Sequence, residues 1–309
     1  MHRIRWALPA AAATLTACSV APVTNMPNAA PPARPASTPA RSARPGTSPA
    51  ATAPASTQAP AVAAEATVPP RLPPARRGGP GRFPPTTPGV LDGKTVLVDP
   101  GHNGGNFTAP AIINRPIWNG REEETCDTTG TETATGYTEA QFNWNVARYL
   151  TADLRARGAT VVLTRTSNTG IGPCVTERAA LGNRAQASAA ISIHADGGPP
   201  GGRGFAILEP VPDGINNAVI GPSARLGTDL RNAFAAGTGE PVSGYDGVDG
   251  IQPRDDLAGV NLTTVPKVFI ECANMRNPTD AGRLVSPTWQ ARAARAIAAG
   301  LIAFLTGKR

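Results

Sequence analysis

The sequence predicts an α/β fold: a mainly parallel, twisted sheet of about six strands with helices on both faces. From residue 91 onward, short apolar runs rich in β-branched residues alternate with longer segments whose apolar residues recur at helical spacing. This alternation is typical of a parallel sheet, because the crossover between two parallel strands is usually a helix. Three of the short runs also deliver a His or a Glu to their carboxyl ends, where open α/β sheets bind their ligands.

The three strand ends carry His102, His194 and Glu271. The runs that precede them span residues 96–98, 189–193 and 267–270. The first run stops at Pro100-Gly101, a typical turn dipeptide, and His102 follows directly. If the three strands are parallel, two imidazoles and one carboxylate meet at one edge of the sheet. That is the composition of a catalytic zinc site.

The remaining elements are strands at 160–164 and 204–208 and helices at 138–157, 175–187, 218–235 and 289–305. The first helix begins with Thr138 as a predicted N-cap, with Gln141 three residues later. Glu139 falls in its first turn, where a carboxylate stabilises the helix dipole by about 0.3 to 1 kcal/mol. From the helix alone, this structural role of Glu139 is favoured over a role as a metal ligand. Asp99, before Pro100, either forms a turn or orients the imidazole of a metal ligand without binding the metal itself.

A long polar stretch, residues 103–137, separates the first strand from the first helix. Connections of this length are uncommon unless they line or cover a site, so we expect it to form one wall of the cleft. Cys126 lies in this stretch and Cys174 in a later polar loop, whereas Cys272 follows an apolar strand and is expected to be a buried thiol. A disulfide between Cys126 and Cys174 would contribute roughly 4 kcal/mol to stability.

Residues 1–18 predict a signal peptide, because Arg3 and Arg5 precede an uncharged apolar stretch too short to span a bilayer. The stretch ends in Leu-Thr-Ala-Cys, which resembles a lipobox, in which Cys18 is lipidated after cleavage. An ordinary signal with a small-residue cleavage site is the alternative interpretation. Export to the cell envelope or periplasmic space follows from both interpretations. A lipid anchor on the outer face of the cytoplasmic membrane follows only from the first.

Residues 19–90 predict a disordered, basic, Pro/Ala-rich linker, because they contain almost no large apolar side chains to bury. Residues 1–90 contain nine Arg and a single acidic residue, whereas residues 91–309 contain 20 Lys and Arg against 21 Asp and Glu. The basic pI is therefore a property of the N-terminal region. This distribution argues against nucleic acid as a partner. Residues 91–309 form the predicted catalytic domain, and we expect a monomer.

Four motifs, in this order, resemble the zinc-dependent N-acetylmuramoyl-L-alanine amidases of the Amidase_3 type, and in particular the short actinobacterial members. They are Val98–His102, Thr138-Glu139 with Asn143, Ser192–Gly197 and Phe269–Asn277. The resemblance covers about residues 94 to 306. Carried over by position, it implies that His102, Glu139 and His194 bind one Zn²⁺ per chain and that Glu271 is the catalytic glutamate.

The resemblance also implies a peptidoglycan hydrolase that cleaves the amide bond between N-acetylmuramic acid and the L-alanine of the stem peptide. Zinc would activate the attacking water, and Glu271 would be the general base. Arg254 and Asn274 are candidates for binding the carboxylates of the stem peptide, with an ion pair to Asp255 or Asp256 as the alternative for Arg254. Two other functions are considered: a catalytically silent amidase-like module that binds peptidoglycan or regulates another enzyme, and a zinc peptidase that cuts elsewhere in the stem peptide.

Overall fold

The computed structural model describes residues 70–72 and 79–308 of the chain. The predicted signal peptide, its Cys18 and most of the predicted linker lie outside the described residues. Those predictions therefore stay predictions.

Seven strands of the described residues form the central sheet. Their spatial order is β1 (Gly81–Phe83), β5 (Thr160–Leu163), β2 (Thr95–Pro100), β6 (Ala189–Asp196), β9 (Lys267–Asn274), β7 (Ala206–Pro210) and β8 (Ile251–Arg254). The four central strands β5, β2, β6 and β9 are parallel neighbours. The prediction of a mainly parallel α/β sheet is confirmed, with seven strands in place of about six.

Two edges of the sheet depart from the parallel pattern. β7 runs antiparallel to β9 and parallel to β8, and β1 runs antiparallel to β5. The sequence predicted neither β1 nor β8, since each has only three or four residues and no continuous apolar run. The antiparallel direction of β7 was not predicted either, because the sequence of an apolar run does not indicate how the strand is oriented relative to its neighbours.

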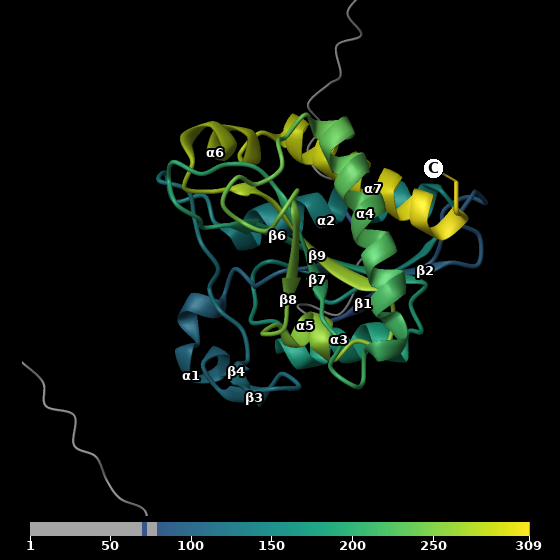
Figure 1. Ribbon diagram of the computed structural model, residues 1–309, viewed down its shortest axis with the longest axis horizontal. Helices are drawn as coiled ribbons and strands as arrows, with labels where there is room; N and C mark the ends of the chain where they lie inside the picture. The colour runs from purple at the N-terminus through teal and green to yellow at the C-terminus, as the bar shows by residue number, and fades with distance from the viewer. Residues whose placement is uncertain (1–69, 73–78, 309) are drawn as a thin grey trace, which may run out of the picture. The chain divides into compact units, whose positions relative to one another are not determined.

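Helices cover both faces of the sheet, as Figure 1 shows. One face packs against α2 (Glu139–Ala156) and α4 (Ile220–Thr238), and α7 (Pro287–Thr306) packs against both of these helices. The other face packs against α3 (Val175–Arg184) and α5 (Ala258–Asn261). The short helix α6 (Pro278–Leu284) precedes α7, and the 3-10 turn η2 (Asn217–Val219) precedes α4. Thr138 caps α2 by accepting a hydrogen bond from the Gln141 amide, as predicted.

The alternation of side chains along each strand divides the core into two layers. Val98 and Ile191 belong to the main core beneath α2, α4 and α7. Leu97 and Ala190, one position away, belong to a smaller cluster on the α3 face. This division fixes which residues at the strand ends can meet on the α3 and α5 face.

The folded region begins earlier than the predicted boundary at residue 91. Phe83 in β1 is buried, and β1 pairs with β5, so residues 81–83 are part of the sheet. Leu72 also packs against the main core. The boundary was placed too late because a three-residue strand with one buried aromatic is too short to change the composition of a Pro-rich segment.

The long segment 103–137 contains secondary structure of its own. It holds the 3-10 turn η1 (Asn106–Thr108), the helix α1 (Pro110–Ile113) and a two-stranded ribbon of β3 (Pro116–Trp118) and β4 (Glu123–Thr125). In Figure 1 these elements form the lobe at the lower left. A disulfide joins Cys126, after the ribbon, to Cys174, at the start of α3, and Cys272 is a buried free thiol.

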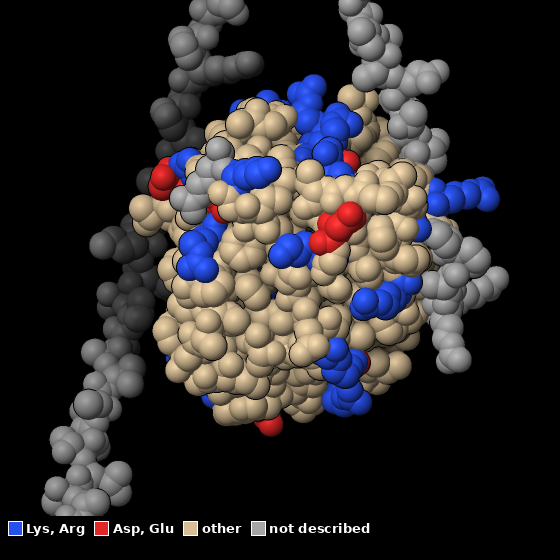
Figure 2. Space-filling view, turned by 90° about the vertical axis from the view of Figure 1, so that its right-hand side faces the viewer, with Lys and Arg blue, Asp and Glu red and all other residues tan. Residues whose placement is uncertain are grey.

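The exposed surface is more basic than the composition of residues 91–309 suggests. Among the described residues, six acidic side chains are buried against three basic ones, so burial removes more negative than positive charge from the surface. The face in Figure 2 accordingly shows many Lys and Arg side chains and few acidic ones. Among the described residues, no helix is long and apolar enough to cross a membrane.

Candidate active site

Two site residues stand side by side on adjacent strands. His194 in β6 is paired in register with Glu271 in β9, so both side chains leave the sheet on the same face. His102 follows the end of β2, the neighbour of β6 on the other side. The predicted meeting of two imidazoles and a carboxylate at the carboxyl edge of three parallel strands is therefore observed.

Glu139 joins this group from the opposite side of the sheet. It begins α2, and its Oε1 lies 3.2 Å from Nε2 of His102 and 2.9 Å from Nδ1 of His194. Its other oxygen accepts a hydrogen bond from the Thr131 amide at 3.0 Å. The first-turn position of Glu139 thus serves the helix and also places a carboxylate oxygen between two imidazoles.

His102, Glu139 and His194 fit a metal ion. Each offers one ligand atom, and these atoms lie within 4.8 Å of one another. Two imidazole nitrogens and one carboxylate oxygen are a donor set found at catalytic zinc sites, where a fourth position holds water or substrate. The tight approach of a carboxylate to two ring nitrogens is also what a bound cation would require of its ligands.

The pKa values of the two imidazoles shift in opposite directions. Burial would lower the pKa of His102, but Glu139 and then Asp127 outweigh burial and raise this pKa to about 10. For His194, burial dominates and lowers the pKa. A metal ligand must be a neutral imidazole, so a cation binding here displaces a proton from His102.

Glu271 has a different environment from Glu139. It lines the same cavity, of about 340 Å³, but its Oε2 is buried with no hydrogen-bond partner among the described residues. Burial, and then the nearby Glu139 and Asp196 carboxylates, raise the pKa of Glu271 well above its usual range. A carboxylate left free of partners in this way is available for proton transfer.

The imidazole of His102 is oriented by Asp127, a residue that the sequence analysis missed. Nδ1 of His102 lies 3.2 Å from Oδ1 of Asp127 and 3.2 Å from the carbonyl oxygen of Thr128. Both are acceptors, so Nδ1 carries a hydrogen, and Nε2 is the nitrogen that can bind a cation once its own proton, which faces Glu139, is displaced. The one sequence signal for Asp127 was its place beside Cys126 in the long loop.

Asp99 has a structural role in place of either predicted one. It is buried, forms ion pairs with Arg178 at 2.9 Å and Lys267 at 3.3 Å, and accepts a hydrogen bond from Ser192. Burial would raise its pKa, but Lys267 and Arg178 hold this pKa well below its usual range. Asp99 therefore forms ion pairs with the buried cations Arg178 and Lys267 next to the site. Among the described residues, it makes no hydrogen bond to either imidazole.

Gly101 allows the strand ends to approach closely. A Cβ at this position would lie 2.1 Å from Cε1 of His194, so a larger side chain would displace the ring. The His194 ring also stacks on Phe269, with centroids 4.8 Å apart. Gly101 and Phe269 therefore both limit where the His194 ring can lie.

The two predicted substrate-binding residues lie in different places. Arg254, at the end of β8, lines the cavity and donates Nε and Nη2 to Asp256, each at 2.6 Å. Asn274 is fully buried, does not line the cavity, and donates to the carbonyl oxygens of Pro199 and Gly202. The structure thus brings Arg254 to the site but gives Asn274 the role of holding a loop.

One cavity wall comes from the long segment, as predicted. The lining residues from this segment are Glu124, Thr125, Asp127, Thr128, Gly130 and Thr131, and Leu257, Gly259 and Phe269 also line the cavity. A mainly parallel α/β sheet gathers two imidazoles and a carboxylate at its edge, beside the Glu271 carboxylate. These are the residue types that metal-assisted hydrolysis requires.

The chain belongs to the N-acetylmuramoyl-L-alanine amidase family Amidase_3, whose family model matches residues 96–303. The N-acetylmuramoyl-L-alanine amidase Rv3717 of Mycobacterium tuberculosis is 39% identical over 220 residues, which are 71% of this chain and 89% of that protein.

Solved structures of two mycobacterial amidases are similar to this chain. The N-acetylmuramyl-L-alanine amidase Ami1 from Mycobacterium smegmatis has 41% identity and a TM-score of 0.67, and covers 71% of this chain and 99% of its own. The apo form of Ami1 from Mycobacterium abscessus has 38% identity and a TM-score of 0.66, and covers 70% of this chain and 100% of its own.

Proposed function

We propose that this chain hydrolyses the amide bond between N-acetylmuramic acid and the L-alanine of the stem peptide, with one zinc ion held by His102, Glu139 and His194. The observation that carries the proposal is the position of Glu139 Oε1 between the two imidazoles, with Glu271 in the same cavity of an amidase-family chain. A silent, non-catalytic module is not favoured, because the ligand set and the candidate base are complete.

When bound, a zinc ion held by His102, Glu139 and His194 would supply Lewis acidity, which polarises a carbonyl and makes water more acidic. Glu271 removes the proton from the attacking water and delivers it to the nitrogen of the departing L-alanine. The water oxygen becomes part of the new lactyl carboxylate, and the carbon–nitrogen bond breaks. Burial makes Glu271 a stronger base, and the positive charge of an ion at His102 and His194 favours its ionised form.

Arg254 supports binding of the stem peptide in this proposal. Its Nε and Nη2 are directed to Asp256, which leaves Nη1 to donate to a substrate carboxylate at the cavity. The ion pair with Asp256 fixes the guanidinium plane, and a fixed plane reduces the entropy lost when a substrate binds. Both sequence hypotheses for Arg254 are therefore compatible in one conformation.

The test is a digest of purified peptidoglycan or muropeptides, followed by mass spectrometry. An amidase releases an intact stem peptide with a free L-alanine amino terminus. A zinc peptidase cuts within the peptide instead, and that product would refute the proposal. We expect Glu271→Gln to keep its zinc and to lose about 10²- to 10⁴-fold in kcat.

Glu209→Gln is the matched control for Glu271→Gln. Glu209 is a partly buried carboxyl on β7, beside β9, and burial raises its pKa to about 7. It does not line the cavity. Loss of activity in Glu271→Gln alone would separate proton transfer from the general effect of removing a buried carboxyl group.

For the whole chain we propose export to the cell envelope, where peptidoglycan lies, with residues 1–18 as the signal. Cys18 is the proposed site of a lipid anchor. Its substitution by Ser should move the mature protein from the membrane fraction to the soluble envelope fraction. An unchanged distribution would leave export in place and remove the anchor.

A further inference from the structure

His102 adopts an unusual backbone conformation for a residue that must be placed accurately. Its φ is 56°, in the left-handed region that residues other than glycine rarely occupy. This conformation costs about 1 to 2 kcal/mol, and it persists only where neighbouring contacts hold it. Besides Glu139, the neighbouring contacts of His102 come from the segment after the β3–β4 ribbon and from Arg178.

Asp127 supplies the charged contact to the His102 ring. Its Oδ1 faces Nδ1 of His102 at 3.2 Å and also accepts the Thr128 amide at 2.8 Å. Its Oδ2 accepts a hydrogen bond from Nη2 of Arg178 at 3.1 Å. The carboxylate is therefore held on both sides, and the side chain is only 4% exposed.

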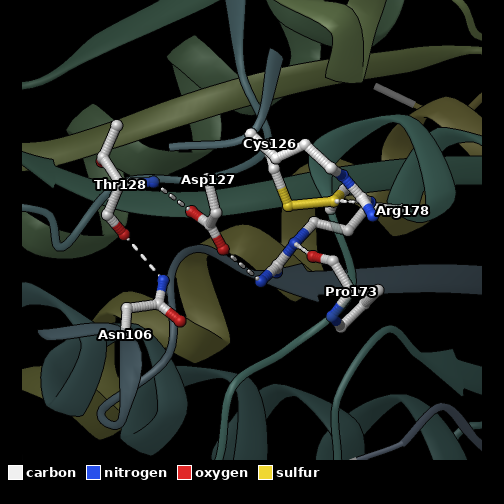
Figure 3. The surroundings of a disulfide bond; sticks show 8 residues. Asn106, Cys126, Asp127, Thr128, Pro173 and Arg178 are labelled. Carbon is white, nitrogen blue, oxygen red and sulfur yellow. Dashed lines mark hydrogen bonds and ion pairs between the residues drawn. A yellow bond between two sulfur atoms is a disulfide. The ribbon is translucent and has the colours of Figure 1, made fainter. Parts of the chain in front are cut away.

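Arg178 connects Asp127 to the end of β2. It lies in α3 and donates to Asp99, to the carbonyl oxygen of His102 at 3.2 Å and to the carbonyl oxygen of Pro173. One guanidinium thus contacts both the backbone of His102 and the carboxylate that orients its ring. Figure 3 shows Arg178 between Asp127 and Pro173.

The disulfide closes this group covalently. Cys126 immediately precedes Asp127, and Cys174 is the N-cap residue of α3, one turn before Arg178. The amide of Val175 also donates to the carbonyl oxygen of Cys126 at 2.9 Å. The two partners of the Asp127–Arg178 ion pair are therefore carried by segments that a covalent bond holds together, as Figure 3 shows.

We propose that Asp127 is a positioning residue that fixes the tautomer and ring direction of His102 for metal binding, and that the Cys126–Cys174 disulfide keeps Asp127 in place. This inference rests on the proposed zinc-binding role of His102. Carboxylates that accept the second nitrogen of a ligand histidine are known to affect metal affinity by about 10- to 100-fold. Asp127 does not contact the substrate in this proposal and acts through His102 alone.

The test measures zinc dissociation constants by competition with a chelator. We expect Asp127→Ala to bind zinc about 10- to 100-fold more weakly than the wild type. Asp127→Asn retains an acceptor for Nδ1, so it should recover part of the affinity, and it preserves the side-chain volume if Asp127→Ala does not fold. Replacement of zinc by Co²⁺ gives a visible spectrum that reports the coordination geometry, which should change in Asp127→Ala.

Glu240→Ala is the matched control for Asp127→Ala. Glu240 is a buried carboxylate with two arginine partners, Arg203 and Arg283, and it does not line the cavity. Its removal should lower stability and leave zinc affinity unchanged. An equal loss of affinity in Glu240→Ala would show that the effect is a general one and would overturn the inference.

The role of the disulfide is tested by a double-mutant cycle. The variant Cys126→Ala/Cys174→Ala should weaken zinc binding, and adding Asp127→Ala should cause no further loss, because both changes act through one contact. If the fold-losses of zinc affinity from removing the disulfide and from Asp127→Ala multiply, the disulfide does not act through Asp127, and its proposed role is overturned. If the wild type binds no zinc, the proposed function fails as well. If the wild type binds zinc and both Asp127 variants bind it equally well, only this inference fails.

Discussion

The site has two sides that are built differently. The strand side consists of His194, Glu271 and the residues beneath them, carried by β6 and β9. The loop side consists of residues 126–131, which contact His102 and Glu139. On the strand side, positions follow from the register of a parallel ladder. On the loop side there is no ladder, and a disulfide and an ion pair take its place.

This difference indicates how each side responds to change. A ladder of backbone hydrogen bonds holds its side chains whatever the neighbouring loops do, so the strand side should provide the essential ligand and the base. The loop side depends on a few contacts between distant residues and should adjust affinity by smaller steps.

His194→Ala should abolish tight zinc binding and reduce kcat by on the order of 10³-fold or more, because the loss of a ligand removes several kcal/mol of transition-state stabilisation. Metal analysis after dialysis and a muropeptide assay measure both effects. The effect should exceed that of Asp127→Ala on the loop side. Equal effects on the two sides would end the distinction between them.

Lys267→Met should lower the free energy of unfolding by about 3 to 5 kcal/mol, because Asp99 would lose one partner of a buried pair. Both side chains are almost fully buried, and Nζ of Lys267 lies 3.3 Å from the carboxylate. Urea unfolding measures the change. Lys308→Met, at an exposed position near the end of the chain, is the control and should have little effect.

Removing the disulfide with Cys126→Ala/Cys174→Ala should lower the free energy of unfolding by about 2 to 4 kcal/mol, since the unfolded chain gains freedom between residues 48 positions apart. Urea unfolding under the same conditions gives the comparison with Lys267→Met. Cys272→Ala tests whether the loss of any cysteine has this effect. A stability unchanged by removal of the disulfide would mean that the loop side is held by its ion pairs alone.

Gly130→Ala should cost about 1 to 2 kcal/mol of stability and also weaken zinc binding. Gly130 has a φ of +72°, which is unfavourable for alanine, and its Cβ would lie 2.7 Å from Oε2 of Glu139. Gly136→Ala is the matched control, since Gly136 has a φ of +80° and open space around it. Gly136→Ala should therefore share the loss of stability but keep the zinc affinity of the wild type.

The sequence predicted the strand side almost completely. Apolar runs that stop at His102, His194 and Glu271 are local patterns, and parallel packing of such runs brings their ends together. The N-cap at Thr138 and the helix after it were local as well, so the start of the helix was predicted correctly. The likeness to the amidase family then assigned Glu139, which its helix position alone could not do.

We could predict the α/β class, the residues at the strand ends and the amidase family from the sequence, because each depends on patterns within a few neighbouring residues. The folded structure was needed to show the antiparallel direction of β7, the burial of Phe83, the contact of Asp127 with His102 and the basic surface left after six acidic side chains are buried. These features join residues far apart in the chain, and their energies depend on distance and burial. Neither quantity exists until the chain has folded.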